Sequence, residues 1–200
     1  MDSYVYREEP GARAEPPLLF VFHGTGGDEH QLIGLGGRVL PGARIVSPRG
    51  DVSEGGALRF FRRTGEGVYD MDDLARATAK MAAFVAAHTG ERRPSRVAGL
   101  GYSNGANILA SVLFSAPELF DAAVLMHPLI PFAPPPQPGL ASRRVLITAG
   151  RRDPICPPER TGALESYLKE QGADVALFWH AGGHELIEPE VGAAAQFLAA

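Results

Sequence analysis

The chain has 200 residues, of which 45% are hydrophobic and 21% charged, the balance of an ordinary globular domain. Its net charge of -4 gives no electrostatic case for binding nucleic acid or an anionic membrane surface. A single cysteine, Cys156, excludes an internal disulfide and a cysteine-based metal cluster. Because no apolar stretch reaches the length of a membrane span and the N-terminus lacks an apolar signal core, we expect one cytoplasmic domain over residues 1–200, without stable membrane insertion.

The first 17 residues are a polar lead-in, in which residues 4–7 can add one short edge strand. The first strong strand is 18–22, and it is apolar throughout, as is typical of a strand covered on both faces. It ends in a glycine-rich turn at 23–28. Asp28 and Gln31 fit a capping box, which predicts a short helix running to about residue 37.

The segment 49–69 follows a second strand at 44–47 and shows no clear period. About twenty residues without regular structure are unusual in a compact domain and often functional. We interpret the segment as a loop on the substrate side. The alternative is an Ω-loop with Phe60 and Phe61 packed into it.

The rest of the chain alternates between strands and helices. We expect strands at 96–100, 122–126, 144–149 and 175–179, helices at 70–90, 104–117, 158–171 and 187–198, and a rigid proline-rich excursion at 131–139. This alternation predicts an α/β fold with a mainly parallel sheet of about six to seven strands and helices on both faces. Ligands of such folds bind at the carboxyl ends of the strands.

The sequence Gly101-Tyr102-Ser103-Asn104-Gly105 lies between a predicted strand and a predicted helix, the context of a nucleophile elbow. A strand can pass directly into a helix only through a tight turn, which strains the serine and needs glycines where backbones approach closely. We therefore predict Ser103 as the nucleophile.

A serine hydroxyl needs a base and a group that orients that base. Asp153 follows the strand at 144–149, and His184 lies on a glycine loop after the last strand, so the order serine, acid, histidine is that of α/β-hydrolases. His180 is the main alternative base. Asp121 and Asp174 precede strands and therefore belong to the opposite edge of the sheet.

The developing oxyanion needs two aligned donors. We expect the backbone N–H of Asn104 to be one. The other is the backbone N–H of Thr25, with Gly26 as the alternative. We predict that five residues bind the substrate, namely His23, Phe60, Phe61, Met126 and His127.

Taken together, these motifs resemble the α/β-hydrolase superfamily, and within it the small phospholipase/carboxylesterase branch that includes acyl-protein thioesterases. The motifs are 23–27, 101–105, the aspartate in 150–154 and the Gly183-His184 pair, supported by Pro48-Arg49-Gly50 and Phe60-Phe61. The likeness runs from about Leu18 to the C-terminus. It implies a serine triad, ester hydrolysis, and neither metal nor cofactor. The chain is too short for a separate lid domain, and it carries Asn104 where many acyl-protein thioesterases have glutamine.

The sequence therefore predicts a short-chain carboxylesterase acting through an acyl-enzyme on a small-molecule ester. A thioesterase, lysophospholipase or acyltransferase would use the same triad. A non-catalytic binding protein of this fold is expected to have lost a triad member, whereas every role has a residue here. A homodimer is compatible with the sequence, and the acyl group and alcohol of the substrate cannot be read from it.

Overall fold

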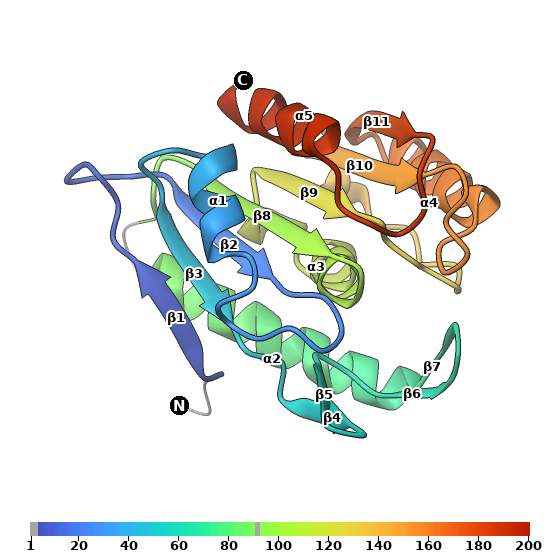
Figure 1. Ribbon diagram of the computed structural model, residues 1–200. Helices are drawn as coiled ribbons and strands as arrows, with labels where there is room; N and C mark the ends of the chain where they lie inside the picture. The colour runs from blue at the N-terminus through green and yellow to red at the C-terminus, as the bar shows by residue number, and fades with distance from the viewer. Residues whose placement is uncertain (1–3, 91–92) are drawn as a thin grey trace.

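A seven-stranded sheet runs through the computed structural model, which describes residues 4–90 and 93–200 (Figure 1). Its spatial order is β1-β3-β2-β8-β9-β10-β11. The strands are β1 (Tyr6–Glu9), β2 (Leu18–Phe22), β3 (Arg44–Pro48), β8 (Val97–Tyr102), β9 (Ala122–Met126), β10 (Arg144–Gly150) and β11 (Asp174–His180). Among the strands of the described residues, only β1 pairs antiparallel in this sheet, with β3. It is the edge strand predicted for the N-terminal lead-in.

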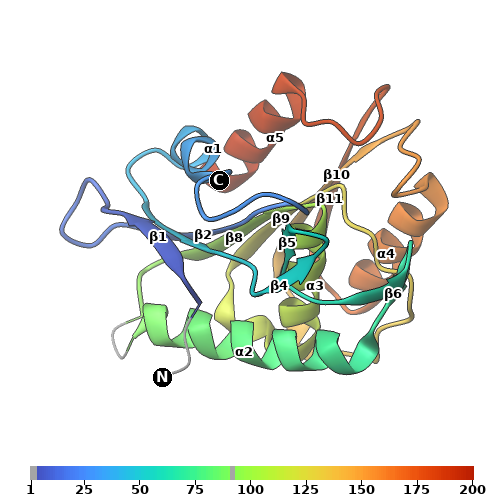
Figure 2. The same ribbon diagram turned by 60° about the horizontal axis from the view of Figure 1, so that its bottom comes forward.

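The helices cover both faces of the sheet, as Figure 2 shows from the side. They are α1 (Ile33–Val39), α2 (Met71–Thr89), α3 (Asn104–Ser115), α4 (Pro158–Glu170) and α5 (Glu188–Ala199), with short 3₁₀ turns at Pro117–Leu119 and Pro138–Leu140. Alternate residues of β2 face opposite sides of the sheet. Phe20 and Phe22 pack with α2 and α3, whereas Leu19 and Val21 pack with α1 and α5. Both faces of the strand are buried, which explains its uninterrupted apolar sequence.

The order of the strands reverses between β2 and β8. From β2 the chain adds β3 on one side, and later adds β8 and the remaining strands on the other. Such a switch point leaves a crevice at the carboxyl ends of the two neighbouring strands, because their outgoing loops turn in opposite directions. The glycine-rich turn after β2 and the elbow after β8 both start there.

Two predicted local features differ in the structure. Asp28 does not cap a helix: it holds a turn through the N–H of His30, and α1 begins only at Ile33. The segment 49–69 is not structureless, because it forms two short hairpins, β4 (Val52–Glu54) with β5 (Ala57–Arg59) and β6 (Arg63–Gly65) with β7 (Val68–Tyr69).

The capping of α2 by Asp70 is as predicted, since its side chain accepts from the N–H of Asp73. Among the described residues, no helix is both long and apolar enough to cross a bilayer.

Candidate active site

The turn between β8 and α3 holds Ser103 in a strained backbone conformation. Its φ is 53° and its ψ is -118°, a region that residues with a Cβ rarely adopt. The two flanking glycines are sterically required. A Cβ at Gly101 would lie 2.4 Å from the carbonyl oxygen of Gly105, and a Cβ at Gly105 would lie 2.0 Å from that of Phe22. The sequence therefore forms the sharp strand-to-helix turn that the spacing predicts, at the amino end of α3.

Backbone contacts hold the loops after β10 and β11 together. A Cβ at Gly150 would lie 2.0 Å from the carbonyl oxygen of Gly183, so the two loops touch at this point. The N–H of Arg152 also donates to the carbonyl of Gly182 at 3.0 Å. These contacts bring Asp153, from one loop, next to His184, from the other.

Three side chains form a continuous hydrogen-bonded line. The Oγ of Ser103 lies 2.8 Å from Nε2 of His184, and Nδ1 of His184 lies 2.7 Å from Oδ2 of Asp153. Tyr102 supports the line, because its hydroxyl donates to the carbonyl of His184 at 2.8 Å. His180, the alternative base, is turned away from the serine: its Nδ1 accepts from the N–H of Gly182.

The carboxylate of Asp153 is buried and fully occupied by donors. Oδ1 accepts from the N–H groups of Ile155 and Cys156, at 2.8 and 2.9 Å. Oδ2 faces Nδ1 of both His184 and His127, the latter at 2.9 Å. Burial by itself would raise the pKa of Asp153, but these hydrogen bonds outweigh it and hold the pKa below its ordinary value. Asp153 is therefore a carboxylate at neutral pH.

A cavity of about 630 Å³ opens in front of Ser103 and His184. Thr25 and Asn104, the residues predicted to supply oxyanion donors, both line it. Asn104 is the first residue of α3, so its backbone N–H is among those without a partner inside the helix. Its side chain fixes the neighbouring segment, because Oδ1 accepts from the N–H of Phe60 at 2.8 Å.

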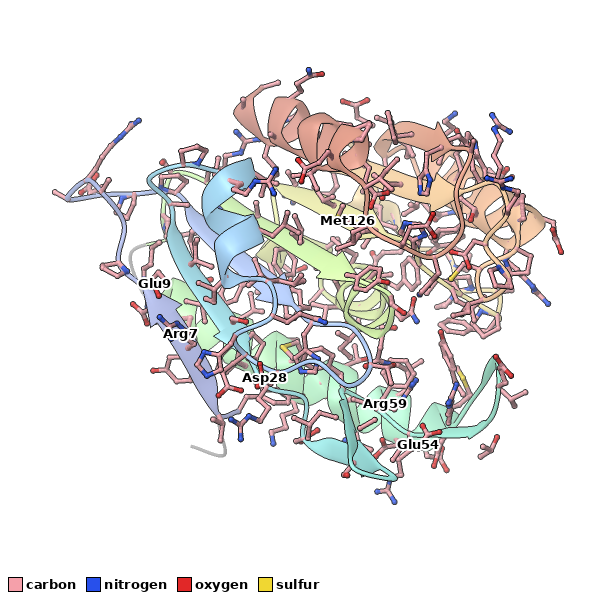
Figure 3. The ribbon with its side chains drawn as sticks, in the orientation of Figure 1. Arg7, Glu9, Asp28, Glu54, Arg59 and Met126 are labelled. Atoms are coloured by element: carbon pink, nitrogen blue, oxygen red, sulfur yellow. The ribbon has the colours of Figure 1, made fainter. Side chains whose placement is uncertain are left out.

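The five residues predicted to bind substrate do not line this cavity, and this expectation is corrected. All five are fully buried, namely His23, Phe60, Phe61, Met126 and His127. The phenylalanines pack into the core below the 49–69 segment, as in the alternative Ω-loop interpretation, and Met126, labelled in Figure 3, lies inside the sheet. His23 holds two loops together, since its Nε2 accepts from the N–H of Gly50 at 2.8 Å. His127 lies behind Asp153, on the side away from the cavity.

Sequence reasoning missed the polar wall of the cavity. Arg59 and Arg63 from the 49–69 segment and Arg160 from α4 line it, together with Tyr69 and Leu129. Arg59, labelled in Figure 3 beside Glu54, is buried and donates to Oγ1 of Thr25 at 2.8 Å. Arginines spread along a sequence are usually solvent-exposed, so no local signal separates these from the others. Only the prediction that 49–69 lies on the substrate side pointed toward Arg59 and Arg63, and nothing pointed toward Arg160.

Histidine and acidic side chains gather twice around His127 closely enough to share an ion. One group is His127, Asp153 and His184, and the other is His127, His180 and Glu190. Each of these side chains already has hydrogen-bonding partners within the groups, described below. A third, partly exposed group lies in the turn after β2 and consists of Asp28, Glu29 and His30.

Comparison with known proteins identifies the family. The model of the dienelactone hydrolase family matches residues 61–195, which is more than half of the chain. The chain belongs to the dienelactone hydrolase family. It is also 42% identical over 175 residues to MhqD of Bacillus subtilis (strain 168), a match that covers 86% of this chain and 88% of that protein.

Solved structures agree with this family. The protein Atu2452 of unknown function from Agrobacterium tumefaciens str. C58 is 59% identical, with a TM-score of 0.90 over 98% of this chain and 96% of that one. The Bacillus cereus carboxylesterase is 35% identical, also with a TM-score of 0.90, over 98% and 93% of the two chains. The α/β-hydrolase fold and the expected resemblance to esterases are confirmed, and the protein is a hydrolase of the esterase type.

Proposed function

We propose that the protein is a serine carboxylesterase in which Ser103 is the nucleophile, His184 the general base and Asp153 the residue that orients the base. The observation that carries this proposal is the line of two hydrogen bonds, 2.8 and 2.7 Å long, from Ser103 through His184 to Asp153. The line ends at the cavity, where an ester can reach the hydroxyl. The Bacillus cereus relative, a carboxylesterase, supports the same reaction class.

In the acylation step, Oγ of Ser103 attacks the ester carbonyl carbon while Nε2 of His184 takes the hydroxyl proton. Asp153 stabilises the imidazolium that forms. The carbonyl oxygen becomes an oxyanion, which the backbone N–H groups of Asn104 and Thr25 stabilise, with the positive end of the α3 dipole behind the former. His184 then donates its proton to the leaving alkoxide, and the alcohol departs.

In the deacylation step, water attacks the acyl-serine and His184 acts first as base and then as acid. The products are a carboxylic acid and free Ser103 hydroxyl. The same machinery attacks a thioester, with a thiol as leaving group, so a matched panel of esters and thioesters identifies the preferred bond.

A fluorophosphonate probe tests the proposal, because it labels only an activated serine. The parent protein should be labelled and should hydrolyse p-nitrophenyl acetate, and Ser103→Ala should lose labelling and roughly 10⁴-fold or more of kcat/KM. Ser115→Ala, at the far end of α3, is the matched control and should behave as the parent. Turnover by Ser103→Ala above about one hundredth of the parent rate would refute the assignment of the nucleophile.

A further inference from the structure

His127 occupies an unusual place directly behind the proposed triad. It follows β9 with a positive φ of 52° and is fully buried. Its Nδ1 lies 2.9 Å from Oδ2 of Asp153, the same oxygen that faces His184. Its Nε2, on the opposite edge of the ring, lies 3.2 Å from Oε2 of Glu190 on α5. One buried imidazole thus bridges two buried carboxyl groups.

The donors and acceptors around this ring assign its proton state. Asp153 is a carboxylate and can only accept, so Nδ1 of His127 donates to it. Glu190 accepts at Oε1 from the N–H of Ile187, and its Oε2 faces Nε2 of His127. If the proton between Glu190 and His127 sat on the glutamate, His127 would be neutral and the buried charge of Asp153 would lose its cationic partner. With the proton on Nε2, both carboxylates face a cation.

His180 completes the arrangement. Its Nδ1 accepts from the N–H of Gly182 at 3.1 Å, so Nε2 is the donor of this ring. That Nε2 lies 3.4 Å from Nε2 of His127 and 3.4 Å from Oε2 of Glu190. Both rings thus turn their Nε2 toward the carboxyl group of Glu190.

We propose that His127 is a protonated second imidazole on the triad aspartate, held charged by Glu190, and that it is a positioning residue that fixes the carboxylate to which His184 is bonded. The role in catalysis rests on the proposed serine mechanism. The proton state of His127 does not.

One physical consequence follows for His184. His127 and the two backbone N–H groups fix the carboxylate of Asp153, so Oδ2 points at Nδ1 of His184 in the free protein. The two rings lie on the same oxygen, with centroids 5.2 Å apart.

The charged and titratable groups that surround this pair come from several elements. They are Tyr102 on β8, Asp153 and Cys156 after β10, His180 on β11, Glu185 in the following loop and Glu190 on α5. Burial and the negative charge of Asp153 raise the pKa of Tyr102 to about 12, and burial raises that of Cys156, so both are neutral in the working range. Although burial opposes it, hydrogen bonding to Glu190 and Asp153 raises the pKa of His127 above its ordinary value.

A metal ion between His127, His180 and Glu190 is the main alternative. A histidine that binds a metal through Nε2 carries its proton on Nδ1 and donates it to a neighbour. Nδ1 of His180 instead faces the N–H of Gly182, so metal binding would place two hydrogens against each other.

The proton state can be measured directly in the intact protein. In a long-range ¹H–¹⁵N spectrum of uniformly labelled protein at pH 8, His127 should show both ring nitrogens protonated. Glu190→Gln, which keeps the shape of the side chain and removes its charge, should convert the His127 signals to those of a neutral ring. Loss of these signals in His127→Gln assigns them.

The functional part is tested by kcat and KM for p-nitrophenyl acetate at pH 8. His127→Gln should lose roughly ten- to a hundredfold in kcat with little change in KM, because Asp153 loses a donor that orients it. Glu190→Gln should lose less, because a neutral His127 can still donate from Nδ1 to Asp153. His88→Gln, on α2 and outside the site, should leave kcat and KM unchanged.

A neutral His127 in the parent at pH 8, or one zinc ion per chain in elemental analysis of the purified protein, would overturn the assignment. So would a kcat equal to that of the parent in folded His127→Gln. Should His127→Gln fail to fold, Glu190→Gln and the parent spectrum still decide the matter. If the parent hydrolyses no ester at all, the proposed function is refuted. The spectrum alone then decides the proton state of His127.

Discussion

At the scale of single residues, the central feature is the carboxylate of Asp153. Two backbone N–H groups and two imidazole rings donate to its two oxygens, so every acceptor direction is in use. A buried carboxylate is stable only when its desolvation is offset in this way. The same contacts that keep it ionised also fix its direction, and the orientation of His184 depends on that direction.

Asp153→Asn should therefore fold and lose activity. The amide keeps the shape but replaces one oxygen with a donor, so His184 loses the acceptor that fixes its proton on Nδ1. We expect kcat to fall roughly 10³- to 10⁴-fold. Steady-state kinetics with p-nitrophenyl acetate measure the loss, and thermal melting verifies the fold. Asp174→Asn, on the exposed start of β11, is the control and should keep the parent kcat. If Asp153→Asn also kept the parent kcat, the assignment of Asp153 to the active site would be refuted.

At the scale of elements, the junction of β8 and α3 places Ser103, the proposed nucleophile. Two glycines let the helix backbone pass against the end of β2, and the serine between them is left in a strained conformation. The strain is local, but the sheet below and the helix behind hold it in place.

Gly105→Ala should destabilise the protein by about 2 kcal/mol or more, because the new Cβ would lie 2.0 Å from the backbone of Phe22 and the core would have to shift. Gly192→Ala is the matched comparison: this glycine lies inside α5 with nothing within 4 Å of the new Cβ. It should stabilise the protein by roughly 0.5–1 kcal/mol. Urea unfolding gives both values, and equal small effects at the two sites would contradict the packing of the elbow.

At the scale of the whole molecule, ionisable groups lower the free energy of unfolding both in acid and at alkaline pH. Glu29 hydrogen-bonds Arg49, which lowers its pKa to about 2, and Asp153 is lowered as described. Such groups stabilise the fold above their unfolded pKa of roughly 4, and this contribution is lost as pH falls through the folded value. His127, whose pKa is raised, stabilises the fold fully below about pH 6.5, and this contribution is lost as pH rises through its folded value.

The free energy of unfolding should accordingly be greatest at about pH 5–6.5 and fall on both sides. Urea unfolding at half-unit intervals from pH 3 to 9 gives the profile. Glu29→Gln should flatten the acid side, because it removes a buried carboxylate paired with Arg49. Glu188→Gln, which breaks an exposed pair with Arg38, should leave the profile nearly unchanged. An identical profile in the parent and Glu29→Gln would contradict the role of Glu29.

The cavity also predicts which esters are used best. It measures about 630 Å³ and its wall combines Leu129 and Ile155 with the side chains of Arg59, Arg63 and Arg160. Each acyl methylene buried against an apolar wall contributes roughly 0.8 kcal/mol, but the wall becomes polar after a few carbons. We expect kcat/KM for p-nitrophenyl esters to peak at short chains, with little activation by micelles. A maximum at twelve to sixteen carbons, or a large jump at the critical micelle concentration, would contradict this prediction.

Local rules were enough to predict much of the molecule. The apolar run at 18–22 and the alternation of strands and helices predicted an α/β fold with a mainly parallel sheet, and the Gly-x-Ser-x-Gly spacing predicted the turn at Ser103. The α/β-hydrolase assignment came from the resemblance of the motifs to that superfamily. These features depend on neighbours in the chain, since turn chemistry and periodicity act over a few residues. The order of Ser103, Asp153 and His184 then followed, because the carboxyl ends of parallel strands meet at one edge of a sheet.

Only the tertiary structure decided between residues whose local sequences look alike. His180 and His184 both follow β11, and contact between the loops at Gly150 and Gly183 brings His184 to Ser103. Phe60 and Phe61 lie in a predicted loop yet are buried, while Arg59 beside them reaches the cavity wall. His127 stands at a strand end like the site residues, but packing against α5 places it behind Asp153. The direction of a side chain at a loop depends on which elements pack against it, and those contacts join residues far apart in the sequence.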